Sequence, residues 1–159
     1  MTLEIRAIRD QDIEDIVSLW HKCGLTRPWN NPHKDIDIAR EEPSSEILVG
    51  IQNSDIVASV MCGFDGHRGW LYYVAVDPGC RGKGFGREIT IAAENWLRDR
   101  GAPKVELMIR DDNFTVRDFY HSAGYTVEPR IVMAKWLKEP PAPQKETSQV
   151  TKTPALEQE

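Results

Sequence analysis

The stretch that decides the fold reads Arg81-Gly82-Lys83-Gly84-Phe85-Gly86. It follows an aromatic and β-branched run over residues 70–76 and opens a stretch with helical spacing that extends to Arg100. Backbone N–H groups of such a loop meet the positive end of the helix dipole, so the pattern predicts an anion site. The glycines leave room for an anion beside the main chain, and Arg81, Lys83 and Arg87 raise the local positive potential.

Spacing separates this loop from two other nucleotide-binding motifs. A P-loop requires Ser or Thr after its Gly-Lys pair, but Gly84 follows Lys83 here. A dinucleotide fingerprint requires G-x-G-x-x-G early in a βαβ unit, whereas this loop has G-x-G-x-G after several strands. A glycine-rich turn that only joins a strand to a helix remains the alternative.

Composition indicates one globular domain without a nucleic-acid or membrane partner. The 159 residues suit a single core, with 40% hydrophobic and 28% charged residues. The net charge of -5 leaves no surplus of Lys and Arg to neutralise phosphates along a nucleic acid. No apolar run approaches the ~18 residues that span a bilayer, so we expect a cytoplasmic protein.

Cysteine and histidine spacing predicts no metal site. No CxxC pair and no HExxH motif is present, and we expect free thiols. The residues concerned are Cys23, Cys62, Cys80, His21, His33, His67 and His121.

The periodicity elsewhere predicts a mixed α/β layer. The expected strands are 3–8, 46–52, 56–64, 70–76 and 105–109, followed by two short strands, or one interrupted at Pro129, over 127–137. The expected helices begin near Asp10, His33, Gly86 and Asn113. Residues 1–138 are expected to form the domain and 139–159 a disordered, proline-rich polar tail.

Two blocks resemble the GNAT family of N-acetyltransferases. Residues 81–86 resemble its Q/R-x-x-G-x-G/A pyrophosphate loop, preceded by Val74-Ala75-Val76-Asp77-Pro78. Residues 113–125 resemble its N-x(6)-Y-x(3)-G-[YF] helix. The resemblance covers about residues 2–137, and residues 27–30 and 65–69 are similar to a YpeA-like bacterial subgroup.

The resemblance implies a twisted, mostly antiparallel sheet of about six or seven strands with about four helices. It also implies acetyl-CoA as co-substrate, with the pantetheine arm along residues 74–76 and the pyrophosphate on the N–H groups of 82–87. The implied cofactor-binding residues are Val74, Val76, Arg81, Gly82, Lys83, Gly84, Phe85, Gly86, Arg87 and Asn113.

Tyr120 is the candidate catalytic residue, because it matches the family tyrosine placed near the thioester sulfur. A phenol with a pKa near ~10 can protonate a thiolate whose acid has a pKa near ~8.5. The alternative is a core aromatic, since Val116, Phe119 and Tyr120 share a helical face. Asn113 likewise suits either the pantetheine arm or a helix N-cap.

The general base is not specified by the resemblance. Family members carry Glu at positions that are Trp70 and Met108 here. Asp65 and His67 are the nearest titratable candidates, with a solvated hairpin turn as the alternative.

The residues expected to line the acceptor pocket are Trp29, Asn30, Tyr72 and Tyr73, with only one of the two tyrosines facing it by strand alternation. The sequence thus predicts acetylation of a primary amine, on a small molecule or a peptide N-terminus. A non-catalytic acyl-CoA-binding module and another nucleotide-binding protein remain the alternatives. The resemblance is compatible with a homodimer.

Overall fold

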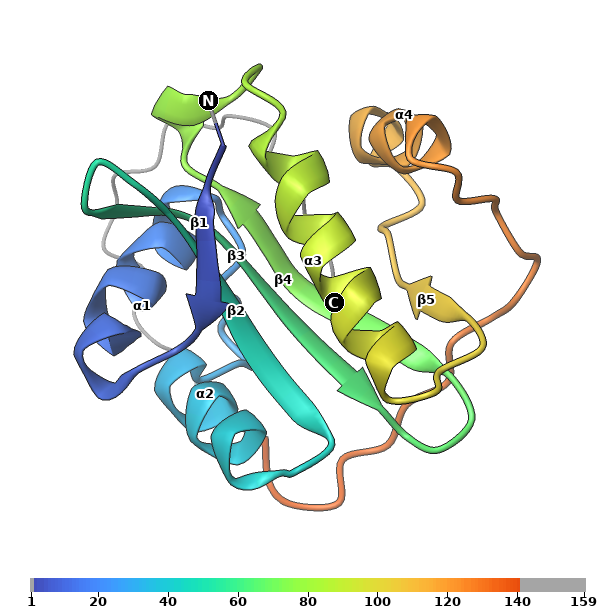
Figure 1. Cartoon of the computed structure of the whole chain (residues 1–159). Helices are drawn as coiled ribbons and strands as arrows, with labels where there is room; N and C mark the ends of the chain where they lie inside the picture. Colours follow the sequence, from blue (N-terminus) through green and yellow to red (C-terminus); the bar gives the residue numbers. More distant parts are fainter. Residues whose placement is uncertain (1, 141–159) are drawn as a thin grey trace.

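The computed structural model describes residues 2–140, so the expected disordered tail lies almost entirely outside the described residues. Within them one five-stranded sheet has the order β1-β2-β3-β4-β5 (Figure 1). The first three pairs are antiparallel, and β4 and β5 are parallel. The strands are β1 (Glu4–Ala7), β2 (Ser45–Gln52), β3 (Asp55–Phe64), β4 (Gly69–Val76) and β5 (Val105–Leu107).

Helices cover both faces of this sheet. Each face of the sheet has its own hydrophobic core. One core joins α1 and α2 to residues such as Val49 and Ala75, and the other joins α3 to residues such as Val60 and Leu71. Figure 1 shows α4 beside α3. The helices are α1 (Ile13–Lys22), α2 (Pro32–Glu41), α3 (Phe85–Asp99) and α4 (Phe114–Ser122). The mixed α/β fold and its element order up to α4 are therefore confirmed.

The strand count predicted from the sequence was wrong. Residues 126–138 form no strand, and β5 ends at Leu107 rather than at Ile109. A β-branched run becomes a strand only when a neighbouring strand bonds its backbone, and Pro129 lacks an N–H to donate. Several large apolar side chains of this segment, including Ile131, Met133 and Leu137, are exposed.

A β-bulge interrupts β4 at Tyr73. Tyr72 pairs with Met61 and Ala75 with Ser59, so three steps along β4 match two along β3. Tyr73 has φ +49°, in the left-handed region that non-glycine residues rarely adopt. As a result Tyr72 and Tyr73 both lie on the α1–α2 side of the sheet. The prediction that only one tyrosine faces this side was wrong, because it assumed regular alternation.

Buried contacts hold the bulge in place. The Tyr73 ring stacks on Trp20 with centroids 3.8 Å apart and planes 8° apart. Trp20 Nε1 donates a hydrogen bond to Ser59 Oγ at 2.9 Å, and Ser59 Oγ donates to the Tyr73 carbonyl at 3.1 Å. The strained backbone is therefore fixed by a stacked pair and a satisfied polar network.

Asp12 is the N-cap residue of α1, and its hydrogen bonds predict how the free energy of unfolding depends on pH. Arg6 donates two hydrogen bonds to the buried Asp12 carboxylate at 2.6 and 3.0 Å, and the Arg9 N–H donates a third at 2.7 Å. The Arg6 hydrogen bonds hold the pKa of Asp12 below its usual value. This stabilisation is therefore present above the unfolded-state pKa of ~3.9 and is lost as the pH falls through the folded-state pKa.

We expect Asp12→Asn to lower the free energy of unfolding by about 2 kcal/mol at pH 7, with a smaller difference from the wild type near pH 3. Urea unfolding at the two pH values measures this. Asp15→Asn, at an exposed position of α1, is the matched control and should change stability by less than about 0.5 kcal/mol. A difference that stays constant between the two pH values would contradict this account of Asp12.

Candidate active site

The predicted anion loop, residues 81–86, leads into the N-terminus of α3, which no side chain caps. Its N-cap is Gly84, which makes no side-chain hydrogen bond to the helix, whereas Asn31 and Asn113 cap α2 and α4 with their side chains. Gly82 and Gly84 have φ of +79° and +81°, and a Cβ built on either meets no atom within 4 Å. Both positions thus have a backbone conformation that favours glycine and face open space, where an anion can approach the N–H groups.

Phe85 and Gly86 have a packing role, and their predicted backbone contact to the cofactor stays a prediction. Both are buried, and a Cβ on Gly86 would lie 3.3 Å from Cζ of Phe119 and 3.6 Å from Cγ2 of Val76. Gly86 therefore allows α4 to pack closely on α3, while the Phe85 side chain belongs to the core. Only their backbone N–H groups are available to the predicted anion.

The charges around the loop suit a phosphate group. Lys83 and Arg87 are exposed, and Arg81 is half-buried. Glu88, in the first turn of α3, accepts a hydrogen bond from the Leu3 N–H at 2.9 Å. Burial raises the pKa of the Cys23 thiol, and the charge of the nearby Arg81 partly opposes this effect.

The strand before the loop loses its β5 neighbour half-way along. The β4–β5 ladder covers Gly69 to Leu71 only, so within residues 2–140 the edge of β4 from Tyr72 onward has no strand beside it on the β5 side. Val74 and Val76 lie on this part of β4. The Val76 carbonyl accepts a hydrogen bond from the Cys23 thiol at 3.2 Å. The open edge provides the backbone surface that the predicted pantetheine contacts need.

Tyr120 and Asn113 both lie at α4. Tyr120 is 1% exposed, and its ring packs edge-on against Phe119 and Tyr125 at centroid distances of 4.9 and 5.3 Å. The Asn113 side chain accepts a hydrogen bond from the Val116 N–H at 3.3 Å, which is the N-cap role. The packing and capping alternatives are thus observed, and the catalytic and pantetheine roles of these residues stay predictions.

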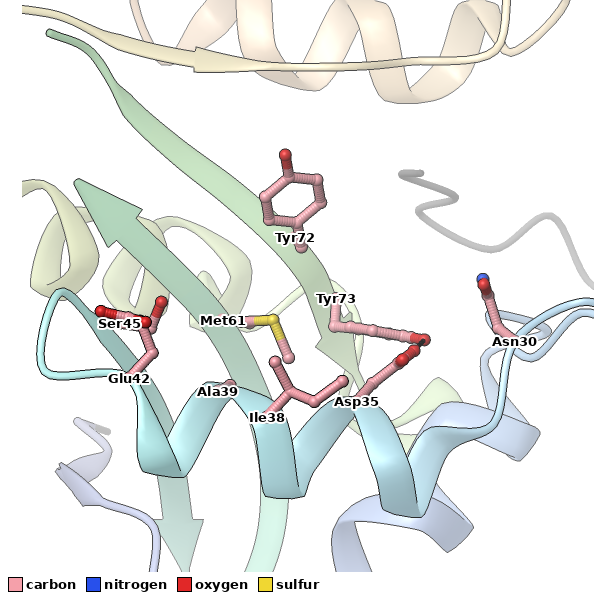
Figure 2. Close-up of a pocket in the computed structure, with 9 residues that line it drawn as sticks. All are labelled: Asn30, Asp35, Ile38, Ala39, Glu42, Ser45, Met61, Tyr72 and Tyr73. Carbon is pink, nitrogen blue, oxygen red and sulfur yellow. Dashed lines mark hydrogen bonds between the residues drawn. The ribbon is translucent and has the colours of Figure 1, made fainter. Parts of the chain in front are cut away.

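A pocket of about 390 Å³ lies between α2 and the bulge of β4 (Figure 2). It contains Asn30, Tyr72 and Tyr73, three of the four residues that the sequence analysis named for a pocket. Sequence reasoning missed the side chains of α2 and of its C-cap Glu42, although Asp35, Ala39 and Glu42 have the i, i+4, i+7 spacing of one helix face. The full lining is Asn30, Asp35, Ile38, Ala39, Glu42, Ser45, Met61, Tyr72 and Tyr73.

Asp35 is the titratable group at the bulged end of this pocket. The Tyr73 hydroxyl donates a hydrogen bond to its Oδ2 at 2.6 Å, and no other described side chain bonds or pairs with the carboxylate. Burial raises the pKa of Asp35, and the Tyr73 hydrogen bond opposes part of that rise. Burial and the Asp35 charge together raise the pKa of Tyr73, so its hydroxyl stays protonated as a donor. A carboxylate with a raised pKa beside a cavity is well placed to receive a proton.

The other predicted acceptor residues lie outside this pocket. Trp29 lines a second cavity of about 480 Å³ with Ala134, Lys135 and Trp136. Asp65 and His67 are exposed in the β3–β4 turn. Asp65 Oδ1 accepts the N–H groups of Arg68 and His67 at 2.7 and 2.8 Å, and these bonds lower its pKa. Asp65 has the geometry of a turn residue, and the substrate roles of all three stay predictions.

Comparison with known proteins identifies the family. The family model described as "Acetyltransferase (GNAT) family" matches residues 11–125. The chain belongs to the GNAT acetyltransferase family. An acetyltransferase of Pectobacterium atrosepticum is 41% identical over 137 residues, which cover 86% of this chain and 97% of the relative. An acetyltransferase of Yersinia pestis is 40% identical over 135 residues, covering 85% and 96%. The chain is thus an acyltransferase enzyme.

Solved structures with low identity support the same fold. AAC(6')-Iy in complex with a CoA bisubstrate analogue has a TM-score of 0.75 at 12% identity, covering 86% of this chain and 99% of that one. Glucosamine-6-phosphate N-acetyltransferase from Arabidopsis thaliana has a TM-score of 0.69 at 20% identity, covering 87% and 100%. Among residues 2–140, no helix is long and apolar enough to cross a membrane, and no cluster of three or more potential ligands suits a metal ion.

Proposed function

We propose that this GNAT enzyme transfers an acetyl group from acetyl-CoA to a primary amine of a small molecule or a peptide N-terminus. The observation that carries the proposal is the continuity of β4. Tyr72 and Tyr73 line the pocket, and the unpaired edge of β4 at Val74 and Val76 leads directly into the predicted anion loop before α3. A thioester held along β4 by its pantetheine arm would therefore present its acetyl group to the pocket.

The chemistry requires three proton transfers, because the nitrogen loses two protons and the thiolate gains one. The acceptor enters as an ammonium and must lose a proton before its nitrogen lone pair attacks the thioester carbonyl. Asp35 is the carboxylate of the pocket that lies beside the bulge of β4, and it can receive this proton and pass it to water. As the N–C bond forms and the C–S bond breaks, the nitrogen loses its second proton to water, and the thiolate takes a proton from Tyr120, which is restored from solvent. The products are the amide, CoA with a free thiol, and one proton.

We also propose that the chain belongs to the YpeA-like bacterial subgroup, supported by residues 27–30 and 65–69. A cytoplasmic location and a homodimer remain predictions from the sequence.

A continuous assay of CoA release with a panel of amines and N-terminal peptides tests the proposed function. Failure to bind acetyl-CoA would overturn it.

The pH dependence of turnover tests Asp35. Asp35 must be ionised to accept a proton, so kcat/KM should rise with pH through its raised pKa. Tyr73→Phe removes the hydrogen bond that favours the carboxylate, so the pKa of Asp35 should rise and the acid limb should move to higher pH. Profiles of kcat/KM from pH 4 to 9, with one verified acceptor, measure the shift.

Asp35→Asn is the companion variant, because it keeps the size of the side chain and removes its titration. We expect the Asp35 limb to disappear and kcat/KM to fall about 10-fold, which is less than the usual 10²- to 10⁴-fold for a general base because water can also accept the proton. An unchanged acid limb in both variants would show that another group is the base.

A further inference from the structure

The pocket at α2 carries two carboxylates at opposite ends. Asp35 lies at the bulge beside Tyr73, and Glu42 lies beside Ser45 at the other end (Figure 2). The two residues are seven apart, which corresponds to about 10 Å along a helix. No Lys, Arg or His is among the lining residues, and neither carboxylate forms an ion pair with a described residue. Glu42 accepts a hydrogen bond from Ser44 Oγ at 3.2 Å.

An apolar surface separates the two carboxylates. Ile38, Ala39 and Met61 lie between them in Figure 2, and the Tyr72 ring lies on the β4 side. Ile38 is 67% exposed, although it is a large aliphatic residue at the pocket. A ligand with methylene groups at this position would remove apolar surface from water on both molecules.

Charge and shape together select one class of acceptor. A phosphate or carboxylate in this pocket would face two negative charges without a basic partner, which opposes binding. A chain with a positive charge at each end and methylenes between them matches the order carboxylate, apolar surface, carboxylate.

We propose that the pocket binds a linear aliphatic diamine or polyamine, with the reacting amine at Asp35 and a distal ammonium at Glu42. This inference rests on the proposed acetyl transfer and adds the substrate class. Asp35 handles the reacting nitrogen, and Glu42 acts only on the distal charge. The two carboxylates can therefore be tested separately.

The experiment compares acceptors that differ at the distal end only. α,ω-Diamines with four, six and eight carbons are assayed by CoA release beside monoamines and ω-amino acids of the same length. We expect the best diamine to exceed its monoamine in kcat/KM by about fivefold, which is the size of an exposed charge pair, and the ω-amino acid to be the poorest.

Glu42→Gln provides the second arm, with Glu41→Gln on an exposed neighbouring position as the matched control. Glu42→Gln should lower kcat/KM for the diamine to about that of the monoamine and leave the monoamine unchanged. Glu41→Gln should change neither. Equal use of diamine and monoamine, equal loss for both in Glu42→Gln, or no turnover of any diamine would overturn the inference.

Calorimetry with acetyl-CoA on the same preparations separates the two proposals. If the protein binds acetyl-CoA and acetylates amines other than diamines and polyamines, only the diamine assignment is wrong. If the protein does not bind acetyl-CoA, the proposed function is wrong as well.

Discussion

Gly84→Asp should abolish CoA binding in a chain that stays folded. The residue is at φ +81°, which Asp and Asn tolerate better than most residues, and its Cβ would enter open space. A carboxylate there would lie beside the predicted pyrophosphate, where like charges about 4 Å apart repel by about 4 kcal/mol at an effective dielectric constant of 20. We therefore expect the Kd for CoA, measured by calorimetry, to rise at least ~100-fold.

Gly84→Asn is the matched control, since it adds the same shape at the same backbone conformation without the charge. It should weaken CoA binding far less than Gly84→Asp does, and both variants should keep the wild-type circular dichroism spectrum. An acetylated pantetheine fragment has no pyrophosphate, so the wild type and Gly84→Asp should use it equally well. Wild-type affinity for CoA in folded Gly84→Asp would show that the cofactor lies elsewhere.

The glycine-rich turn that joins β4 to α3 could be predicted from the sequence because its signal is local, and its anion binding stays a prediction. Three glycines and three cations fall within seven residues at the junction of a strand and a helix, so they restrict the backbone conformation and set the local charge. The structure distinguishes roles that the sequence alone does not: Gly82 and Gly84 adopt positive φ, while Gly86 allows Phe119 to pack closely against α3.

The pocket between α2 and β4 could not be predicted in the same way, because it depends on contacts between distant segments. Asp35 reaches Tyr73 across 38 positions of sequence, and the bulge that turns Tyr73 toward α2 is supported by Trp20 and Ser59. The run Tyr72-Tyr73 gives no local sign of a bulge, so the alternation rule places one ring on the wrong face. The prediction of strands over residues 127–137 was wrong for a related reason. A high β propensity favours an extended backbone, but it does not provide a neighbouring strand to pair with.

Tyr120→Phe should lower kcat by about 100-fold while leaving acetyl-CoA affinity and stability nearly unchanged. The substitution keeps the ring that packs against Phe119 and Tyr125 and removes the only titratable group of the side chain. General acid catalysis contributes about 10²- to 10⁴-fold, and the lower end applies because a thiolate is already a fair leaving group. The expected loss corresponds to about 3 kcal/mol in the transition state. Steady-state kinetics with a verified acceptor, together with CoA calorimetry and thermal unfolding, measure it.

Tyr125→Phe distinguishes a catalytic hydroxyl from a structural one in the same aromatic cluster. The Tyr125 hydroxyl is buried and has no hydrogen-bond partner among the described residues, so its removal breaks no bond and should not lower stability. Its ring contacts Tyr120 directly, so any effect of altered packing on Tyr120 would appear in this variant too. We expect Tyr125→Phe to keep kcat within about twofold of the wild type. If both variants lose turnover equally, the cluster acts through packing. If Tyr120→Phe keeps most of its turnover, solvent protonates the departing thiolate and Tyr120 is not the general acid.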